Sequence, residues 1–278
     1  MERLRAGYCE RAHPRDSSRK TVISFARCRV LVFWTKNPRP LLPYLDEIRE
    51  RGFRFYFQHT LNNYEREHLE PGVPPLEQRV DCFRELSERI GKERVIWRFD
   101  PVLLGGGIDV PEILRRIYDI GQRLQHHTER LVFSFLDMYA VTRRRLPRIV
   151  PPFRPPTPTE QRETAAGLAA FNREWRLELR ACAEALDLSE AGIFPGRCID
   201  PELIQRLCPG DPEVTRFCDR ARAADQFSLP GIPGRGAPKD ASQRELCGCA
   251  PSRDIGAYNT CGHCCAYCYA DFSGRGKG

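Results

Sequence analysis

The C-terminal part of the chain carries three cysteines whose spacing suits an iron–sulfur cluster. Cys261, Cys265 and Cys268 follow the pattern CxxxCxxC. Thiolates are the usual ligands of cubic 4Fe–4S clusters, and each thiolate on this short stretch could bind its own iron. The remaining iron would keep an open position, as catalytic metal sites do for a substrate or cofactor. The spacing therefore predicts a catalytic 4Fe–4S site.

Four further cysteines suggest a second metal site. Cys182 ends an apolar run, Cys198 follows it, and Cys247 and Cys249 precede the main motif. Four thiolates suit an auxiliary iron–sulfur cluster or a structural zinc ion. The alternative for Cys182 is a small buried core residue, which is common for a free cysteine.

A zinc protein is the competing interpretation. Cys247 and Cys249 together with Cys261 and Cys264 would also make a four-thiolate zinc site, because zinc and iron both accept thiolates. Cys264 does not fit the CxxxCxxC spacing and is interpreted as a residue that does not bind the cluster. This alternative predicts a non-catalytic structural or interaction protein, and it stays open from spacing alone.

Composition narrows the class of protein. The chain has thirteen cysteines among 278 residues and no apolar stretch behind its first residues. Clustered thiols without an export signal indicate metal binding or catalysis in the cytoplasm rather than disulfides. No apolar run approaches the ~18 residues of a membrane span. The net charge, 44 − 37 = +7, permits a nucleic-acid partner without requiring one.

Apolar runs of strand length alternate with amphipathic segments. Strands are expected at 30–34, 53–58, 95–99, 131–136 and 177–183, and helices at 39–51, 77–90, 110–124 and 160–174. Such alternation is typical of parallel strands joined by crossover helices. It predicts an α/β fold, a complete or partial TIM-like (β/α) barrel, with a doubly wound open sheet as the alternative.

Proline and cysteine content divides the chain. We expect a barrel-like domain over residues 1–228, a Pro/Gly-rich linker over 229–246 and a Cys-rich metal-binding tail over 247–278. A second proline-rich stretch, 147–158, is expected to be an extended loop.

The tail motif resembles that of the radical S-adenosylmethionine superfamily. Cys261, Cys265 and Cys268 with Tyr267 match its pattern of CxxxCx(aromatic)C. The resemblance implies a β/α barrel in which the open iron binds S-adenosylmethionine. One electron then cleaves this cofactor to a deoxyadenosyl radical, which abstracts a hydrogen atom from substrate. The usual motif follows the first strand, whereas here it lies near the end of the chain.

The whole chain resembles a bacterial family catalogued as domain of unknown function number 1848, which shares this placement. The matching stretches are 32–38 (VFWTKNP), 94–101 (RVIWRFDP), 196–202 (GRCIDPE) and 254–261 (DIGAYNTC). The resemblance runs from about residue 30 to 272. Family members open with an additional strand bearing a Ser-Arg-Arg-Thr-Asp-like stretch. Only His13-Pro14-Arg15-Asp16 stands before the first expected strand here, so that strand is expected to be missing, through a late start codon or a degraded copy.

Polar residues follow the expected strands, where the chemistry of β/α barrels is located. Lys36, Arg98, Asp100 and Asp137 are the candidate catalytic residues, and Asn37, Gln58, Tyr139 and Tyr267 are the candidate cofactor-binding residues. Long cations at strand ends are costly to bury alone, so Lys36 or Arg98 could hold a carboxylate. The two aspartates could accept hydrogen bonds from ribose hydroxyls. The alternative is that these residues only form turns.

Together these patterns predict a radical S-adenosylmethionine-type enzyme of unknown small-molecule or macromolecular substrate. Its cofactors would be a 4Fe–4S cluster and S-adenosylmethionine, with an auxiliary cluster or zinc. Its partner would be an electron donor such as ferredoxin or flavodoxin. A member inactivated by the missing strand is a further alternative.

Overall fold

A computed structural model describes residues 1–13, 16–149, 152–226, 244 and 246–271. The chain divides into two compact units. Unit 1 contains Met1–Phe33, Pro43–Tyr56 and Gly196–Ala257, and unit 2 contains Trp34–Leu42, Phe57–Pro195 and Tyr258–Gly278. The segment 247–278 is therefore shared, because its first part belongs to unit 1 and its second part to unit 2.

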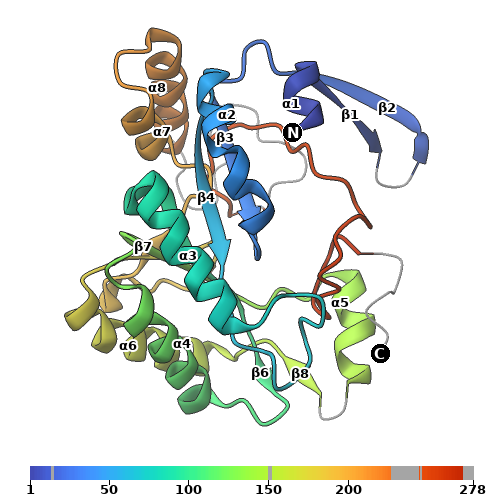
Figure 1. Cartoon of the computed structure of the whole chain (residues 1–278). Helices are drawn as coiled ribbons and strands as arrows, with labels where there is room; N and C mark the ends of the chain where they lie inside the picture. Colours follow the sequence, from blue (N-terminus) through green and yellow to red (C-terminus); the bar gives the residue numbers. More distant parts are fainter. Residues whose placement is uncertain (14–15, 150–151, 227–243, 245, 272–278) are drawn as a thin grey trace. The chain divides into compact units, whose positions relative to one another are not determined.

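Six strands form one sheet in the order β10-β9-β7-β5-β4-β3 (Figure 1). They are β3 (Val30–Thr35), β4 (Arg54–Thr60), β5 (Val95–Val102), β7 (Arg130–Phe135), β9 (Glu178–Ala181) and β10 (Phe194–Pro195). The neighbours β4–β5, β5–β7, β7–β9 and β9–β10 pair in parallel. The predicted α/β class with parallel strands is confirmed.

The strand order distinguishes between the two predicted sheet types. The order follows the chain without the reversal that defines a doubly wound sheet. Strands β3 and β10 are the two edges, so no barrel is closed among the described residues. The closed form of the predicted barrel is therefore not present in this part of the chain.

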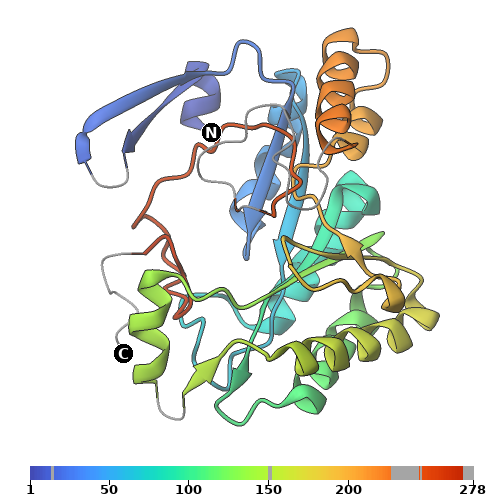
Figure 2. The ribbon, with the colours of Figure 1, turned by 180° about the vertical axis from the view of Figure 1, so that it is seen from behind.

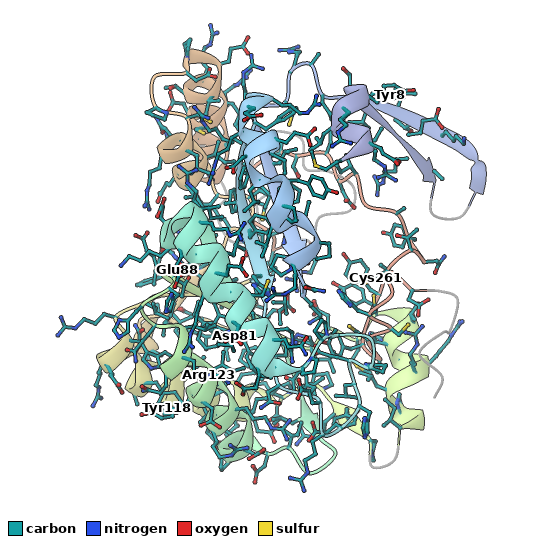
Figure 3. All side chains as sticks on the ribbon, viewed as in Figure 1. Tyr8, Asp81, Glu88, Tyr118, Arg123 and Cys261 are labelled. Atoms are coloured by element: carbon teal, nitrogen blue, oxygen red, sulfur yellow. The ribbon has the colours of Figure 1, made fainter. Side chains whose placement is uncertain are left out.

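Three long helices connect the strands of unit 2. They are α3 (Leu76–Ile90), α4 (Val110–Leu124) and α6 (Pro158–Trp175). Helix α3 packs beside α4, and α4 packs beside α6 (Figure 2). Apolar residues at helical spacing are buried, whereas Asp81 and Glu88 of α3 project from its outer side (Figure 3). This is the amphipathic pattern that the sequence predicts.

Capping residues fix where these helices begin. Asp109 accepts the backbone N–H of Glu112 at the start of α4. Thr157 and Glu160 form a capping box at the start of α6, with Pro158 in the first turn. Each cap satisfies an N–H group that the helix leaves unpaired. The helices therefore start at a defined distance from the preceding strands.

Two predicted elements, a helix and a loop, differ from those in the structure. The stretch expected as one helix over 39–51 is a 3₁₀-helix, Arg39–Tyr44, followed by α2 (Leu45–Glu50). Pro40 and Pro43 explain the difference, because proline lacks the N–H that an α-helix needs. The loop expected at 147–158 contains β8 (Phe153–Arg154), which pairs with β6 (Leu104–Gly105).

Unit 1 contains elements that periodicity did not predict. An N-terminal helix α1 (Glu2–Ala6) leads into an antiparallel hairpin of β1 (Tyr8–His13) and β2 (Asp16–Ser24). Two helices, α7 (Pro201–Leu207) and α8 (Pro212–Gln226), pack together. The hairpin forms a sheet of its own, and β3 is the first strand along the chain in the described six-stranded sheet. The predicted loss of a preceding strand stays a prediction.

The predicted linker 229–246 lies almost entirely outside the described residues, and the predicted domain boundaries stay predictions. No helix in the described ranges is both long and apolar enough to cross a membrane.

Candidate functional site

Polar side chains gather at the carboxyl ends of the central strands of unit 2. Arg98 on β5 pairs with Asp100 and lies 3.4 Å from Gln58 Oε1 of β4. Asp100 also accepts a hydrogen bond of 2.6 Å from the Ser134 hydroxyl of β7. Arg98 and Gln58 are buried, and about a third of the Asp100 side chain is exposed. Three neighbouring strands thus contribute to one connected polar cluster.

Asn62, directly after β4, holds this cluster to the loop that follows. Its side-chain amide donates to the backbone oxygen of Asp100 at 2.8 Å, and its side-chain oxygen accepts the Asp100 N–H at 2.9 Å. The same amide also reaches Glu70 Oε1 at 3.1 Å and the Tyr267 hydroxyl at 3.0 Å. Asn62 therefore links the strand ends to the cysteine motif.

Glu70 is the centre of a second buried cluster. Its side chain is 1% exposed, and Oε1 accepts a hydrogen bond from Lys36 Nζ at 2.8 Å. Tyr267 donates its hydroxyl to the same oxygen. The other oxygen lies 3.9 Å from the guanidinium of Arg79, which is itself buried. Burial raises the pKa of Glu70, but Lys36 and the other donors outweigh it, so the pKa is lowered and the carboxylate is charged.

The cysteine motif docks on the loop that carries Glu70. The Gly72 N–H donates to the His263 carbonyl at 3.0 Å, and the Ala266 N–H donates to the Leu69 carbonyl at 2.8 Å. Gly72 permits this close approach, because a Cβ there would lie 2.1 Å from the Gly262 carbonyl oxygen. Main-chain contacts on both sides of Glu70 therefore hold the segment Cys261–Cys268, termed here the cysteine loop.

The three cysteines of the motif differ in exposure. Cys261 is exposed (Figure 3), Cys265 is buried and Cys268 lies between these extremes. Burial raises the pKa of Cys265 to about 12, and the neighbouring Lys36 opposes that shift. Each of the other two thiols also interacts electrostatically with Cys265. Both other thiols of the motif are thus close enough to Cys265 to influence its charge, and the predicted role of the three as cluster ligands stays a prediction.

No group of three or more His, Cys, Asp or Glu side chains in the described ranges is arranged so that it could hold a metal ion. The thiols nevertheless match a cluster in chemical type. A single zinc ion draws its thiolates to within about 2.3 Å of itself. The thiolates of a cubic cluster each bind a different iron and are spaced more widely. The donor set of the cysteine loop thus matches a cluster in ligand type, and the predicted cluster stays a prediction.

The second set of cysteines divides between the units. Cys198, Cys247 and Cys249 lie in unit 1, whereas Cys182 lies in unit 2, buried at the end of β9. The Cys249 thiol interacts with both Cys198 and Cys247 and accepts the Cys198 N–H at 3.0 Å. Three of the four predicted ligands are thus together in unit 1.

Main-chain contacts and one tyrosine organise this thiol group. The Ile199 N–H also points at Cys249 Sγ, at 3.4 Å, and the Ala250 N–H donates to the Ile199 carbonyl at 2.9 Å. The buried Tyr56 hydroxyl donates to the Cys198 carbonyl at 2.7 Å. The contacts with Cys198 and Cys247, and then burial, raise the pKa of Cys249, whereas its hydrogen bond lowers the pKa of Cys247 to about 6. Cys247 is therefore the thiol of this group that most readily becomes a thiolate, the form that binds metals.

The remaining predicted site residues lie in unit 2 at more exposed positions. Asn37 accepts the Arg39 N–H at 3.2 Å, which is the turn-forming role considered as its alternative. Asp137 is exposed and accepts a hydrogen bond of 3.4 Å from the Tyr139 hydroxyl. The Tyr139 ring lies against that of Tyr269, with ring centres 5.3 Å apart. Their predicted contacts with cofactor or substrate stay predictions.

Sequence reasoning did not single out Glu70 or Gly72. Glu70 lies in the long stretch between β4 and α3, where no periodicity marks it. Its importance depends on contacts with Lys36 and Tyr267, which are 34 and 197 residues away in the chain. The only available signal was the sequence Glu70-Pro71-Gly72, an acid followed by two turn formers.

Comparison with known proteins gives one family. A family model described as Domain of unknown function (DUF1848) matches residues 1–270, so the match includes the N-terminal hairpin as well as the cysteine loop. Neither the curated proteins nor the solved structures gave a significant match.

Proposed function

The chain belongs to the DUF1848 family, and from that premise we propose that it is an iron–sulfur enzyme of the radical S-adenosylmethionine type. The observation that carries the proposal is the docking of the cysteine loop. Tyr267, next to Cys268, bonds to Glu70 and Asn62 at the carboxyl end of the sheet. In β/α folds this edge is where substrates and cofactors bind.

Cys261, Cys265 and Cys268 would hold the 4Fe–4S cluster. The chemistry that such a cluster would supply when bound is one electron, which cleaves S-adenosylmethionine into methionine and a deoxyadenosyl radical. Burial of Cys265 excludes water from one side of the site. The main-chain contacts of Gly72 and Leu69 hold the loop in place, and such preorganisation lowers the entropy cost of binding a metal.

The strand-end cluster would bind the organic part of the site. Arg98 and Asp100 lie beside Asn62, which connects them to Tyr267. About a third of the Asp100 side chain is exposed, and its carboxylate would accept hydrogen bonds from ribose hydroxyls. Arg98 orients this carboxylate through their ion pair. We further propose that the sequential sheet is the wall of a partial β/α barrel.

Cys198, Cys247 and Cys249 would form the auxiliary metal site in unit 1, and the predicted role of Cys182 as a further ligand stays a prediction. N–H groups directed at Cys249 and the gathering of three thiols support a thiolate-metal centre. Iron–sulfur and zinc both fit this donor set. This second centre is also the observation that favours the competing hypothesis, a zinc-stabilised protein without catalysis.

The test is cofactor cleavage by anaerobically reconstituted protein. The protein is treated with dithionite and S-adenosylmethionine, and deoxyadenosine and methionine are measured. We expect equal amounts of both products from the wild type and from a matched control, Cys264→Ala. The triple variant Cys261/Cys265/Cys268→Ala should form neither.

Two outcomes would contradict the proposal. A colourless protein that carries zinc after reconstitution would support the structural alternative. A brown protein with iron and sulfide that leaves S-adenosylmethionine intact would identify an inactive member of the family.

A further inference from the structure

Lys36 and Glu70 form an ion pair whose position beside the cysteine loop is more specific than turn formation requires. Lys36 Nζ lies 2.8 Å from Glu70 Oε1, and the two side chains are 14% and 1% exposed. A buried ion pair is rarely a gain in stability over apolar residues. Its presence at this site therefore calls for a functional reason.

The pair reaches the cysteine loop through Tyr267. Lys36 Nζ lies 5.5 Å from the centre of the Tyr267 ring, in the position of a cation–π contact. Glu70 accepts the hydroxyl proton of the same tyrosine. Tyr267 stands between Cys265 and Cys268 in the sequence, so both charges approach the loop between two of its thiols.

Cys265 interacts electrostatically with both members of the pair, and the two effects oppose each other. A cluster held by thiolates carries excess negative charge, and nearby charges help to set its reduction potential. Burial makes this influence strong, because little water screens the charges. A fixed cation stabilises the reduced, more negative state, whereas a fixed anion destabilises it.

We propose that Lys36 and Glu70 tune the reduction potential of the centre held by Cys261, Cys265 and Cys268, Lys36 raising it and Glu70 lowering it. This inference rests on the proposed function. The reaction concerned is the uptake of one electron by the 4Fe–4S centre, with the electron supplied by an external one-electron reductant. Both residues act as positioning residues through Tyr267 and the thiols.

The test is a redox titration of the reconstituted full chain with dithionite, followed by electron paramagnetic resonance. We expect Lys36→Met to shift the midpoint potential downward and Glu70→Gln to shift it upward. Lys36→Arg keeps the charge and should stay near the wild-type value. Lys92→Met is the matched control, because Lys92 is exposed in the turn Lys92–Arg94 before β5. Its position is at the opposite end of the strands, and it should leave the potential unchanged.

Opposite shifts in the two variants support the proposal. The proposal would be overturned if the potentials were unchanged or if both variants shifted in the same direction. It would also be overturned by a shift in Lys92→Met as large as that in Lys36→Met. Each of these results would still establish that the cluster is present. If Lys36→Met fails to fold, the upward shift in Glu70→Gln decides the question. A wild-type protein that assembles no cluster would remove both this inference and the proposed function.

Discussion

The two cysteine groups are held in different ways. In unit 2, the cysteine loop lies beside a buried cation, a buried carboxylate and the ends of parallel strands. In unit 1, Cys249 is surrounded by two other thiols and by backbone N–H donors. Charged side chains around the first group can influence reactivity, whereas main-chain donors around the second mainly fix geometry. Under the proposed function, the reactive centre would be in unit 2 and the structural one in unit 1.

The largest effect on the difference between the two cysteine groups is expected from a substitution of Glu70. Glu70→Ala leaves Lys36 buried without its carboxylate, and removing one partner of a buried pair costs about 3–5 kcal/mol. We expect a loss of that order in the free energy of unfolding, measured by urea denaturation, together with loss of iron from the cysteine loop. Glu77→Ala removes an exposed carboxylate paired with Arg123 and should change little. Equal effects of the two variants would show that Glu70 has no special role.

Acid should weaken unit 2 through His59. This ring is fully buried against Phe83, and burial, then Arg79, lowers its pKa to about 3. Because the unfolded state takes up a proton near pH 6.5, stability is complete above that pH and falls as pH drops toward 3. At pH 4 the loss is on the order of 3 kcal/mol.

His59→Phe removes this proton-binding difference while retaining an aromatic ring. Urea unfolding at pH 7 and pH 4 should show a smaller pH dependence in the variant than in the wild type. An identical pH dependence in both proteins would mean that His59 is not the group responsible.

Gly72 tests whether the docking of the cysteine loop matters independently of charge. In Gly72→Ala the new methyl group overlaps the Gly262 carbonyl oxygen, and such overpacking costs about 1–3 kcal/mol. We expect reduced iron content in the reconstituted protein. Gly262→Ala is the matched control on the other side of the same contact, where a Cβ meets nothing within 4 Å. Full iron content in both variants would refute a role for this contact.

The smallest effect is expected in unit 1. Tyr56→Phe removes the hydroxyl that donates to the Cys198 carbonyl and accepts the Asp200 N–H, and loss of such buried hydrogen bonds costs about 1–2 kcal/mol. Thermal unfolding should show this loss, and the electron paramagnetic resonance signal of the cysteine loop should be unaffected. A changed signal would mean that the two thiol groups are not independent.

The sequence predicts the regular elements of the fold better than the contacts that support the candidate site. Strands such as β5 and helices such as α4 carry strong periodicity, and their limits agree closely with the structure. The CxxxCxYC motif is likewise readable because its ligands are adjacent in the chain. The roles of Glu70 and Gly72 could not be predicted from the sequence, because each residue depends on a partner that is far away in the chain.

The spacing of apolar residues also failed to predict the N-terminal hairpin and the division of the segment 39–51. The hairpin of β1 and β2 contains few apolar residues, so its strands show no buried face that periodicity could detect. The segment 39–51 has the spacing of one helix, but its prolines divide it. In both cases the spacing of apolar residues alone was too weak a signal.

The central claim is that the cysteine loop, and not the thiol group of unit 1, holds the reactive cluster. The direct measurement is iron and sulfide analysis with electron paramagnetic resonance, on anaerobically reconstituted Cys261/Cys265/Cys268→Ala and Cys198/Cys247/Cys249→Ala variants. The account predicts that the first variant loses about four irons, as for one cubic cluster, together with the signal of the dithionite-reduced protein. The second variant should retain that signal. Retention of the signal in the first variant and its loss in the second would contradict the account.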